Sequence, residues 1–262
     1  MSRKALCVGI NNYPGTANDL SGCVNDAKDW AAALKTRGYD ITMLLDDKAT
    51  RANMVSELTK LVTGGAKGDS LVFTYSGHGS WIPDDDGDDA DGRDEMLCPY
   101  DISQNHYLLD DDLADIFAKK ADGVRLHFIS DSCHSGTVSR FAPLGPEFAN
   151  QPKARFLPPE TFLKSKDEIH AARRVALIGH STRQKYPALL AAACQDVQFS
   201  YDANFGGRPN GAFTYWALKE LDKKPETPMQ WMHGIRTHLP TGVYPQNPRL
   251  YGSTAVKRGP MF

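Results

Sequence analysis

Residues 70–80 read SLVFTYSGHGS, an apolar run that passes abruptly into glycine, serine and histidine. The apolar part predicts a buried strand, because strands covered on both faces of a sheet are nearly continuous in apolar residues. Residues 124–136, VRLHFISDSCHSG, repeat this arrangement with a cysteine in the polar part. Functional groups of parallel sheets gather beyond the carboxyl ends of the strands. If the two strands are neighbours, His78 and Cys133 emerge side by side at one edge of the sheet.

The rest of the chain alternates strand-like and helix-like patterns. Further strands are expected at residues 4–10, 39–45, 174–178 and 188–193, and helices at residues 23–37, 50–62, 110–120, 212–221 and 228–238. This order predicts an α/β fold with a mostly parallel sheet and helices on both of its faces. Residues 140–173 hold five prolines, many basic residues and little periodicity. We expect them to form a long surface connection, of a kind that is usually functional or disordered.

The composition sets broad limits on what the protein binds. The net charge of −2 gives no global field that would favour nucleic acid or an acidic membrane. No apolar run approaches the ~20 residues that span a bilayer, and the N-terminal residues show no signal peptide. The five cysteines are widely spaced and include no CxxC pair. We therefore expect a reduced, cytoplasmic protein without a disulfide framework or a structural zinc site.

Cys133 is a candidate nucleophile, and His78 is its candidate base. At neutral pH only a few per cent of an unperturbed cysteine is thiolate, so attack on a carbonyl needs an imidazole that accepts the proton and later delivers it to the leaving amine. Gly77 and Gly79 allow tight turns and the close approach of a substrate. The amides of Gly79 and Cys133 are candidate donors to a developing oxyanion. His134 is a rival base, but consecutive side chains diverge in an extended segment.

Side chains two apart on a strand point the same way, so Asp131 shares a side with Cys133 and Ser76 shares a side with His78. An acid beside the thiol opposes thiolate formation through like-charge repulsion. The arrangement makes sense if Asp131 meets a cationic side chain of the substrate, which predicts cleavage after Lys or Arg. The alternative is that Asp131 caps the turn that follows the strand.

Six segments carry a resemblance to a known family: YSGHGS at 75–80, DSCHSG at 131–136, LSGCVNDA at 20–27, DGRDEMLCP at 91–99, AACQD at 192–196 and NGAFTY at 210–215. Together they resemble the caspase-type cysteine peptidases, and more narrowly the metacaspase and orthocaspase branch. The resemblance runs from the first strand to the last third of the chain. It implies one caspase-hemoglobinase-like three-layer sandwich over residues 1–262.

The resemblance also implies roles for the site residues. His78 and Cys133 would form a catalytic dyad, served by the oxyanion donors described above. Asp26 and Asp131, with Ser76 beside them, would bind the substrate; without the resemblance, an aspartate at a helix start is most often a capping group. The family cleaves after Arg or Lys, so the implied partners are protein or peptide substrates with a basic residue before the cleaved bond. Neither nucleic acid nor a membrane is an expected partner, and the family is generally monomeric.

The same resemblance divides the chain into a large-subunit-like part at residues 1–140, a basic, proline-rich connecting segment at 141–173 and a small-subunit-like part at 174–262. Self-cleavage in the 140–174 segment is a hypothesis, because a mobile basic loop offers the right residue type. The basic residues there include Arg140, Lys153, Arg155, Lys164, Lys166, Arg173 and Arg174.

Residues 84–95, DDDGDDADGRDE, pack eight acids into twelve positions. Oxygen-rich loops with glycine suit Ca²⁺, although this spacing is not that of an EF-hand, and the alternative is a solvated acidic loop. Many metacaspases are activated by calcium, and Asp94, Asp110 and Asp111 match the acids that such relatives use. Arg140 stands where a further acid is usual, which argues against calcium dependence. The chemistry itself requires no cofactor, so Ca²⁺ is considered only as an activator.

Other interpretations stay open at this point. The chain could be a caspase-like binding or regulatory module with weak or lost catalysis, although both dyad residues and both proposed pocket acids are present. It could be a legumain-like or gingipain-like peptidase of the same broad fold, although DSCHSG and NGAFTY favour a metacaspase. Cys133 could also be a small buried hydrophobe beside a loop histidine. A serine hydrolase is disfavoured, because no GxSxG elbow follows any strand.

Overall fold

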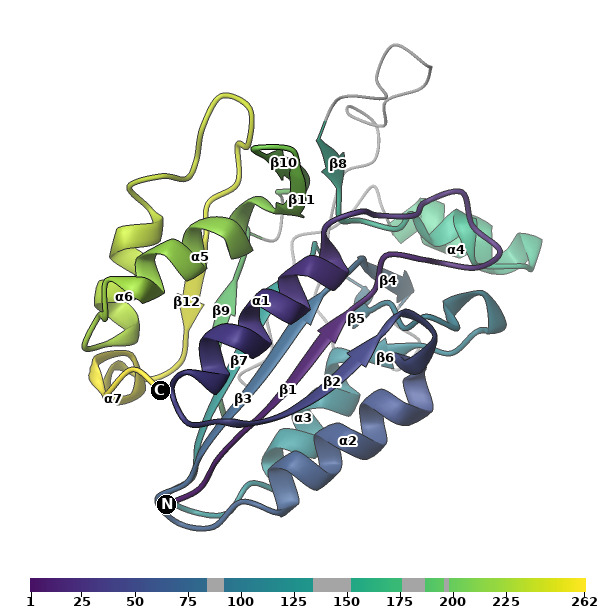
Figure 1. Ribbon diagram of the computed structural model, residues 1–262. Coiled ribbons are helices and arrows are strands. Elements are labelled where there is room, and N and C mark those ends of the chain that lie inside the picture. The colour runs from purple at the N-terminus through teal and green to yellow at the C-terminus, as the bar shows by residue number, and fades with distance from the viewer. Residues whose placement is uncertain (84–91, 134–151, 176–186, 196–197) are drawn as a thin grey trace.

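A computed structural model of the chain describes residues 1–83, 92–133, 152–175, 187–195 and 198–262 (Figure 1). Its centre is a six-stranded sheet in the order β12-β9-β7-β3-β1-β2. The strands are β1 (Arg3–Gly9), β2 (Asp40–Leu45), β3 (Ser70–Ser76), β7 (Arg125–Asp131), β9 (Leu189–Ala192) and β12 (Arg249–Tyr251). Neighbours in this sheet run parallel, except that β12 pairs with β9 in the antiparallel direction.

Helices cover both faces of the sheet and make three layers (Figure 1). One face carries α1 (Cys23–Lys35), α5 (Ala212–Asp222) and α6 (Pro228–Ile235), and the other carries α2 (Arg51–Thr63) and α3 (Asp110–Ala118). These five helices end within three residues of their predicted bounds. The arrangement confirms the predicted α/β sandwich with a mostly parallel sheet. A short α7 (Thr254–Arg258) lies near the C-terminus.

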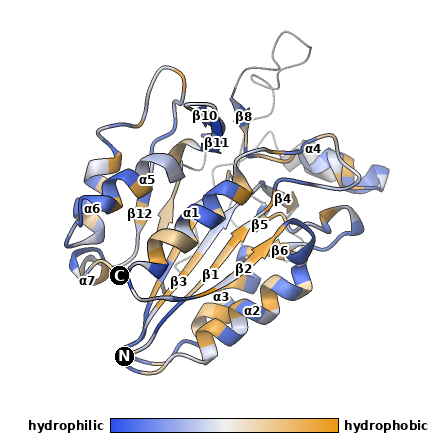
Figure 2. Ribbon diagram, viewed as in Figure 1, coloured by the Kyte–Doolittle hydropathy of each residue, from blue (hydrophilic) through white to orange (hydrophobic). Residues whose placement is uncertain are grey.

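The alternation of side chains along the central strands feeds both layers. Leu6 and Val8 of β1 belong to the core shared with α2 and α3, whereas Ala5 and Cys7 belong to the core shared with α1, α5 and α6. Figure 2 shows the central strands as an apolar centre between helices whose outward faces are polar. Strands buried on both sides need apolar residues at successive positions, which explains the continuous runs in the sequence.

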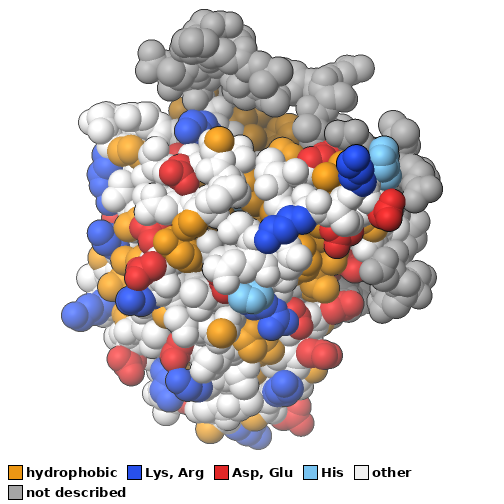
Figure 3. Space-filling model, turned by 90° about the vertical axis from the view of Figure 1, so that its right-hand side faces the viewer, with side chains coloured by type: hydrophobic (Ala, Val, Ile, Leu, Met, Phe, Trp, Pro, Cys, Tyr) orange, Lys and Arg blue, Asp and Glu red, His pale blue; other side chains and the backbone are white. Residues whose placement is uncertain are grey.

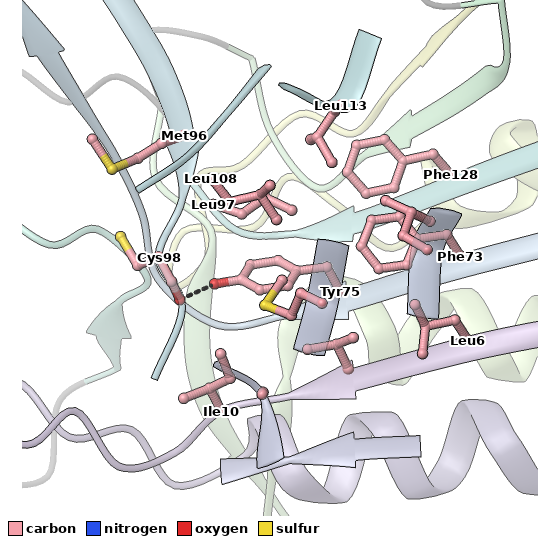
Figure 4. Close-up of a cluster of buried hydrophobic side chains, with 14 of the residues drawn as sticks. Leu6, Ile10, Phe73, Tyr75, Met96, Leu97, Cys98, Leu108, Leu113 and Phe128 are labelled. Atoms are coloured by element: carbon pink, nitrogen blue, oxygen red, sulfur yellow. Dashed lines mark hydrogen bonds between the residues drawn. The ribbon is translucent and has the colours of Figure 1, made fainter. Parts of the chain in front are cut away.

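The core supports the carboxyl edge of the sheet, where the polar motifs begin (Figure 4). Phe73 of β3 stacks on Phe128 of β7 with ring centroids 4.9 Å apart. The hydroxyl of Tyr75 lies within hydrogen-bond distance of two main-chain carbonyls, those of Cys98 at 2.9 Å and His78 at 2.6 Å. Because buried carbonyls seldom go without a partner, this hydroxyl fixes the main chain that leaves β3.

Two small antiparallel sheets, which were not predicted, flank this edge. One contains β4 (Gly79–Pro83), β5 (Arg93–Leu97) and β6 (Leu108–Leu109); the other contains β8 (Lys153–Ala154), β10 (Tyr201–Phe205) and β11 (Arg208–Gly211). Three single turns of 3₁₀ helix occur at Asp46–Lys48, Ile102–Gln104 and Pro159–Thr161. The small sheets matter because β4 begins directly after His78, and β8 lies across the edge of the sheet where Cys133 emerges.

The strand expected at residues 174–178 is wrong at its start, because α4 (Lys166–Val175) extends through that position; the remainder lies outside the described residues. A capping box begins this helix. The amide of Glu168 donates to Ser165 Oγ, and the amide of Ser165 donates to the Glu168 carboxylate, both at 3.0 Å. This reciprocal pair satisfies two main-chain donors and favours a helix where the apolar residues alone suggested a strand.

The long surface connection expected at residues 140–173 is also wrong for its second half. Residues 134–151 lie outside the described part of the chain, but the following segment enters the core. Its buried residues are Arg155, Phe156, Leu157, Phe162 and Leu163. The prolines and basic residues hid this burial, because the apolar residues among them follow no strand or helix period.

The surface carries no feature of a membrane protein within the part of the chain that the structure describes: no helix there is long and apolar enough to cross a bilayer. On the face shown in Figure 3, acidic and basic side chains are interspersed. Neither sign of charge gathers into one continuous patch on that face, in keeping with the small net charge of −2.

Candidate active site

The pairing of β3 with β7 brings the two polar motifs together. Ser76, the last residue of β3, lies opposite Asp131, the last residue of β7. His78 and Cys133 each follow two residues further on, so both emerge from neighbouring strands at the same edge. Both are buried, with 2% of His78 and 0% of Cys133 exposed.

The ring of His78 is oriented by its surroundings. Nε2 lies 2.6 Å from the carbonyl oxygen of Asn18, and because a carbonyl only accepts, Nε2 carries the proton. The ring packs against Tyr13 at 4.7 Å between centroids, and the amide of His78 donates to the Tyr13 hydroxyl at 2.8 Å. Nδ1 is buried and has no hydrogen-bond partner. A neutral imidazole with an unoccupied Nδ1 can accept a proton from a group brought beside it.

Burial lowers the pKa of His78 to about 4, against an opposing effect of the Asn18 carbonyl. The imidazole is therefore neutral at physiological pH and available as a base. Gly77 is required next to it: a Cβ at that position would lie 2.6 Å from the hydroxyls of both Tyr13 and Tyr75. The glycine thus permits the close approach of two tyrosines that hold the histidine loop.

The thiol of Cys133 is enclosed by Ser200. The amide of Ser200 donates to Sγ at 2.6 Å, and Sγ lies 3.4 Å from the Ser200 carbonyl oxygen. Burial, followed by the neighbouring thiol of Cys194, raises the pKa of Cys133 well above its usual value, and Asp131 adds to this effect. The resting pair is therefore a thiol and a neutral imidazole, so ion-pair formation has to accompany the reaction rather than precede it.

The chain places one of its own peptide bonds in this site. The carbonyl oxygen of Arg155 accepts hydrogen bonds from the amides of Gly79 at 3.0 Å and Cys133 at 3.2 Å. The amide of Arg155 donates to the Ser200 carbonyl at 2.9 Å, and β8 just before it pairs with β10. A main chain held as an added strand, with one carbonyl pointed at two amides, is the arrangement expected of a bound peptide substrate.

The side chain of Arg155 fills an acidic pocket formed by Asp26, Ser76, Asp131 and Asp202. Nη2 lies 2.7 Å from Asp26 Oδ2 and 3.0 Å from Asp202 Oδ1. Nη1 lies 2.9 Å from Ser76 Oγ and 3.1 Å from Asp131 Oδ2. The side chain is fully buried, with 0% exposed. Removing one partner from a buried ion pair leaves an uncompensated charge, so the pocket is built around a cation.

Further hydrogen bonds hold the two predicted acids. Asp26 accepts from the amide of Gly211 at 3.0 Å, and Asp131 accepts from the amide and hydroxyl of Thr214 at 2.9 and 2.7 Å. Burial raises the pKa of Asp26 from 3.8 to about 6, opposed by Arg155 and reinforced by Asp131. A side chain on Gly211 would collide with both the Asp131 carboxylate and the Arg155 guanidinium. These contacts join the carboxyl edge of the sheet to the start of α5.

The structure therefore gathers Asp26, Ser76 and Asp131 around one guanidinium. Two contributors went unnoticed in the sequence, Ser200 and Asp202. Neither lies in an apolar periodic segment, and the strand that carries Asp202 pairs only with two other short strands. The rival base His134 and the departure at Arg140 lie outside the described residues.

The residues suggested for calcium lie apart from this site. Asp110 and Asp111 open α3, and Asp94 lies in β5, which pairs with the β6 strand just before α3. Among the described residues, no group of three or more His, Cys, Asp or Glu side chains could hold a metal ion. Residues 84–91 of the acidic loop fall outside that description. The calcium site stays a prediction, and no step of the chemistry depends on it.

Comparisons with known proteins agree on one family. The profile described as "Metacaspase, peptidase C14 domain" matches residues 3–141. Metacaspase-1 of Cryptococcus neoformans is 33% identical over 99% of this chain, which spans 64% of that protein. Metacaspase-1B of Aspergillus oryzae is also 33% identical over 99% of this chain, which spans 70% of that protein.

Solved structures give the same result for the fold. A protein from Geobacter sulfurreducens is 30% identical with a TM-score of 0.74, covering 99% of this chain and 98% of that one. Caspase-1 from Spodoptera frugiperda, at 13% identity, has a TM-score of 0.60 over 96% of this chain and 86% of that one. At that identity the likeness concerns the fold alone, and it defines a caspase-like α/β sandwich. With the sequence matches, the chain belongs to the metacaspases, a family of cysteine peptidases.

Proposed function

We propose that this chain is a cysteine endopeptidase that cleaves after Arg or Lys, and that the Arg155–Phe156 bond of its own connecting segment is a substrate. One observation carries the proposal. The Arg155 carbonyl lies on the amides of Gly79 and Cys133 while its guanidinium lies among Asp26, Ser76 and Asp131. A basic side chain and a scissile carbonyl are thus held at once, as a productive complex requires.

The first step follows from the protonation states. His78 Nδ1 takes the proton of the Cys133 thiol as Sγ attacks the Arg155 carbonyl carbon, and the carbonyl oxygen becomes an oxyanion on the amides of Gly79 and Cys133. His78 then gives this proton to the Phe156 nitrogen as the peptide bond breaks. The product is a thioester between Cys133 and Arg155, with Phe156 as a free amine.

The second step hydrolyses the thioester. A water molecule gives its proton to His78 and attacks the same carbonyl, and the oxyanion again forms on the two amides. Collapse expels the Cys133 thiolate, which recovers the proton from His78. The net reaction consumes one water and leaves a carboxylate on Arg155. Other proteins or peptides with a basic residue before the cleaved bond are expected to follow the same path.

Purified protein tests the self-cleavage. The wild-type chain should split into fragments 1–155 and 156–262, and N-terminal sequencing of the second should begin at Phe156. Cys133→Ala and Arg155→Ala should both stay intact. Lys164→Ala is the matched control, because Lys164 is an exposed basic residue of the same segment, and it should split as wild type does. Splitting of the Cys133→Ala protein would show that another protease makes the cut.

Fluorogenic peptides ending in Arg, Lys, Asp or Asn test the activity on other substrates, with and without Ca²⁺. Cleavage after Arg and Lys supports the proposal, and cleavage after Asp alone contradicts it. If no peptide is cleaved and the chain stays intact in every condition, the alternative of a catalytically weak binding or regulatory module holds. The two calcium conditions also test whether Asp94, Asp110 and Asp111 serve an activating ion.

The remaining attributes form part of the same proposal. We place the peptidase in the cytoplasm as a monomer, with residues 1–140 and 174–262 as its two subunit-like parts. The five cysteines are free and buried, which suits a reducing compartment. Arg155 lies inside the connecting segment at 141–173, so the proposed cut separates the two parts at a position between them.

A further inference from the structure

We propose that Asp202 is a third acid of the substrate pocket, which binds the second terminal nitrogen of an arginine and so makes the pocket prefer Arg to Lys. The inference rests on the proposed cleavage after basic residues and deepens it. Asp202 lies in β10, far in sequence from Asp26 and Asp131. Only 7% of the residue is exposed.

The two terminal nitrogens of Arg155 are bound from different sides. Nη1 is taken by Ser76 and Asp131, at 2.9 and 3.1 Å. Nη2 is taken by Asp26 and Asp202, at 2.7 and 3.0 Å. Nε has no hydrogen-bond partner. Recognition thus depends on the forked end of the guanidinium and on having two nitrogens to offer.

A lysine cannot reproduce this arrangement. Its ammonium is a single donor atom on a stem one bond shorter, whereas a guanidinium presents its donors in a rigid, planar fork. The ammonium can approach the Asp131 side or the Asp26 side at hydrogen-bond distance, but not both. Asp202 then becomes a buried carboxylate whose cation is out of reach, and that penalty falls on Lys and not on Arg.

Asp202 also has a structural role that has to be separated from this one. Its carboxylate accepts from the amides of Ser21 at 2.7 Å and Gly22 at 3.0 Å, just before α1 begins. Asn11 does the same work one turn on, since its Oδ1 accepts from the amides of Cys23 at 2.8 Å and Val24 at 3.1 Å. Asn11 is therefore a matched control: it caps the same helix end without contacting the guanidinium.

The first experiment uses the chain's own bond. Self-cleavage rates are measured for Arg155 and Arg155→Lys, each with Asp202, with Asp202→Asn and with Asn11→Ala. With Asp202, the lysine should slow cleavage about tenfold or more. With Asp202→Asn this ratio should fall below about threefold, because the arginine loses the partner that the lysine never had. Asn11→Ala should lower both rates together and leave the ratio intact.

A binding measurement keeps the inference testable even if no variant cleaves. Titration calorimetry follows the amides of acetyl-Lys-Ala-Arg and acetyl-Lys-Ala-Lys, which copy residues 153–155, binding to the Cys133→Ala, Arg155→Ala protein. The preference for the arginine peptide should drop about tenfold in Asp202→Asn and stay unchanged in Asn11→Ala. Asp202→Ser, which keeps an uncharged acceptor for the helix amides, replaces Asp202→Asn if that variant fails to fold.

The outcomes are distinct. An Arg-to-Lys ratio that stays within about twofold of the parent in both Asp202 variants overturns the inference and leaves Asp202 as a helix-capping residue. Absence of cleavage with an intact binding preference contradicts the proposed enzyme while supporting the role of Asp202. Equal loss of both peptides in the Asp202 variants, together with a lowered melting temperature, assigns a structural role only.

Discussion

The two sides of the Arg155–Phe156 bond are held by different physics. On the N-terminal side, residues 153–155 are held by main-chain pairing and by ion pairs to Asp26, Asp131 and Asp202, and Lys153 is exposed. On the C-terminal side, Phe156 and Leu157 belong to the apolar core. The amide of Leu157 also donates to the Gly79 carbonyl, and its carbonyl accepts from Ser80 Oγ. Polar contacts exchange with water and respond to pH, whereas a core anchor does not, so only the N-terminal side is built to be released.

The largest expected effect comes from closing the acidic pocket. Gly211→Ala places a methyl group against Asp131 and the guanidinium, so the N-terminal side loses its seat while the C-terminal side stays buried. Self-cleavage should slow at least about 100-fold, since small misplacements of a reacting bond cost that much. Gly242→Ala is the matched control, because a Cβ there meets nothing within 4 Å. Rates are followed on denaturing gels, and an unaffected Gly211→Ala protein would contradict the pocket assignment.

The next effect concerns the anchor. Leu157→Ala, made in the Cys133→Ala protein to prevent cleavage, removes a fully buried side chain from the core. The free energy of unfolding should fall by about 2–5 kcal/mol, as for other large-to-small core substitutions. Urea denaturation monitored by tryptophan fluorescence measures it. A change below about 0.5 kcal/mol, typical of surface sites, would mean that the C-terminal side is not an anchor.

A pH series separates the two sides further. The pKa of Asp26 is about 6, above the 3.8 of a free carboxyl, because burial outweighs the attraction of Arg155. As the pH falls through 6 the pocket loses a negative charge, so self-cleavage should slow about tenfold per unit below that point. The imidazole does not cause this limb, because the pKa of His78 is about 4. Charged or titratable groups that act on Asp26 or Arg155 here are Asp131, Asp202, Cys23 and His78.

The same shift has an opposite sign for folding. Because Asp26 binds its proton more readily in the folded chain, its contribution to stability is fully present below pH 3.8 and is lost as the pH rises through about 6. Titration of this group therefore does not unfold the chain near pH 5. Circular dichroism should stay constant where the cleavage rate falls, and a parallel loss of both signals would contradict the assignment.

The smallest effect is expected at Lys153. Its ammonium donates to the Asp19 carbonyl at 3.2 Å from an exposed position. Lys153→Ala should change the free energy of unfolding by less than about 0.5 kcal/mol and should leave self-cleavage within about twofold of wild type. A larger loss in cleavage alone would reveal a binding site for this residue on the substrate path. Both quantities come from the assays used above.

The sequence was informative where structure is local. The strands that end near His78 and Cys133 are long and apolar, and side-chain parity predicted Asp131 as a pocket residue. Asp26 came only from the family resemblance, because an aspartate at a helix start has an ordinary structural use. Arg155 was one of seven basic residues in its segment, and nothing local distinguished it.

The rest depends on pairings that no short window reveals. Asp202 reaches the pocket because β10 pairs with β8 and β11, strands of five residues or fewer. Such short strands lack a readable period. The α4 helix was missed for another reason: its capping box at Ser165 and Glu168 was present in the sequence but was given less weight than the apolar run that follows.

The anchor of Phe156 and Leu157 has a consequence for how cleavage would be detected. The chain up to Arg155 remains joined through its backbone to β7, and the chain from Phe156 onward remains packed in the core. A cut between them therefore releases no fragment, and the particle keeps its mass and hydrodynamic radius. Gel filtration and light scattering would report an intact molecule, and only a denaturing method or mass spectrometry with its added water would count two chains.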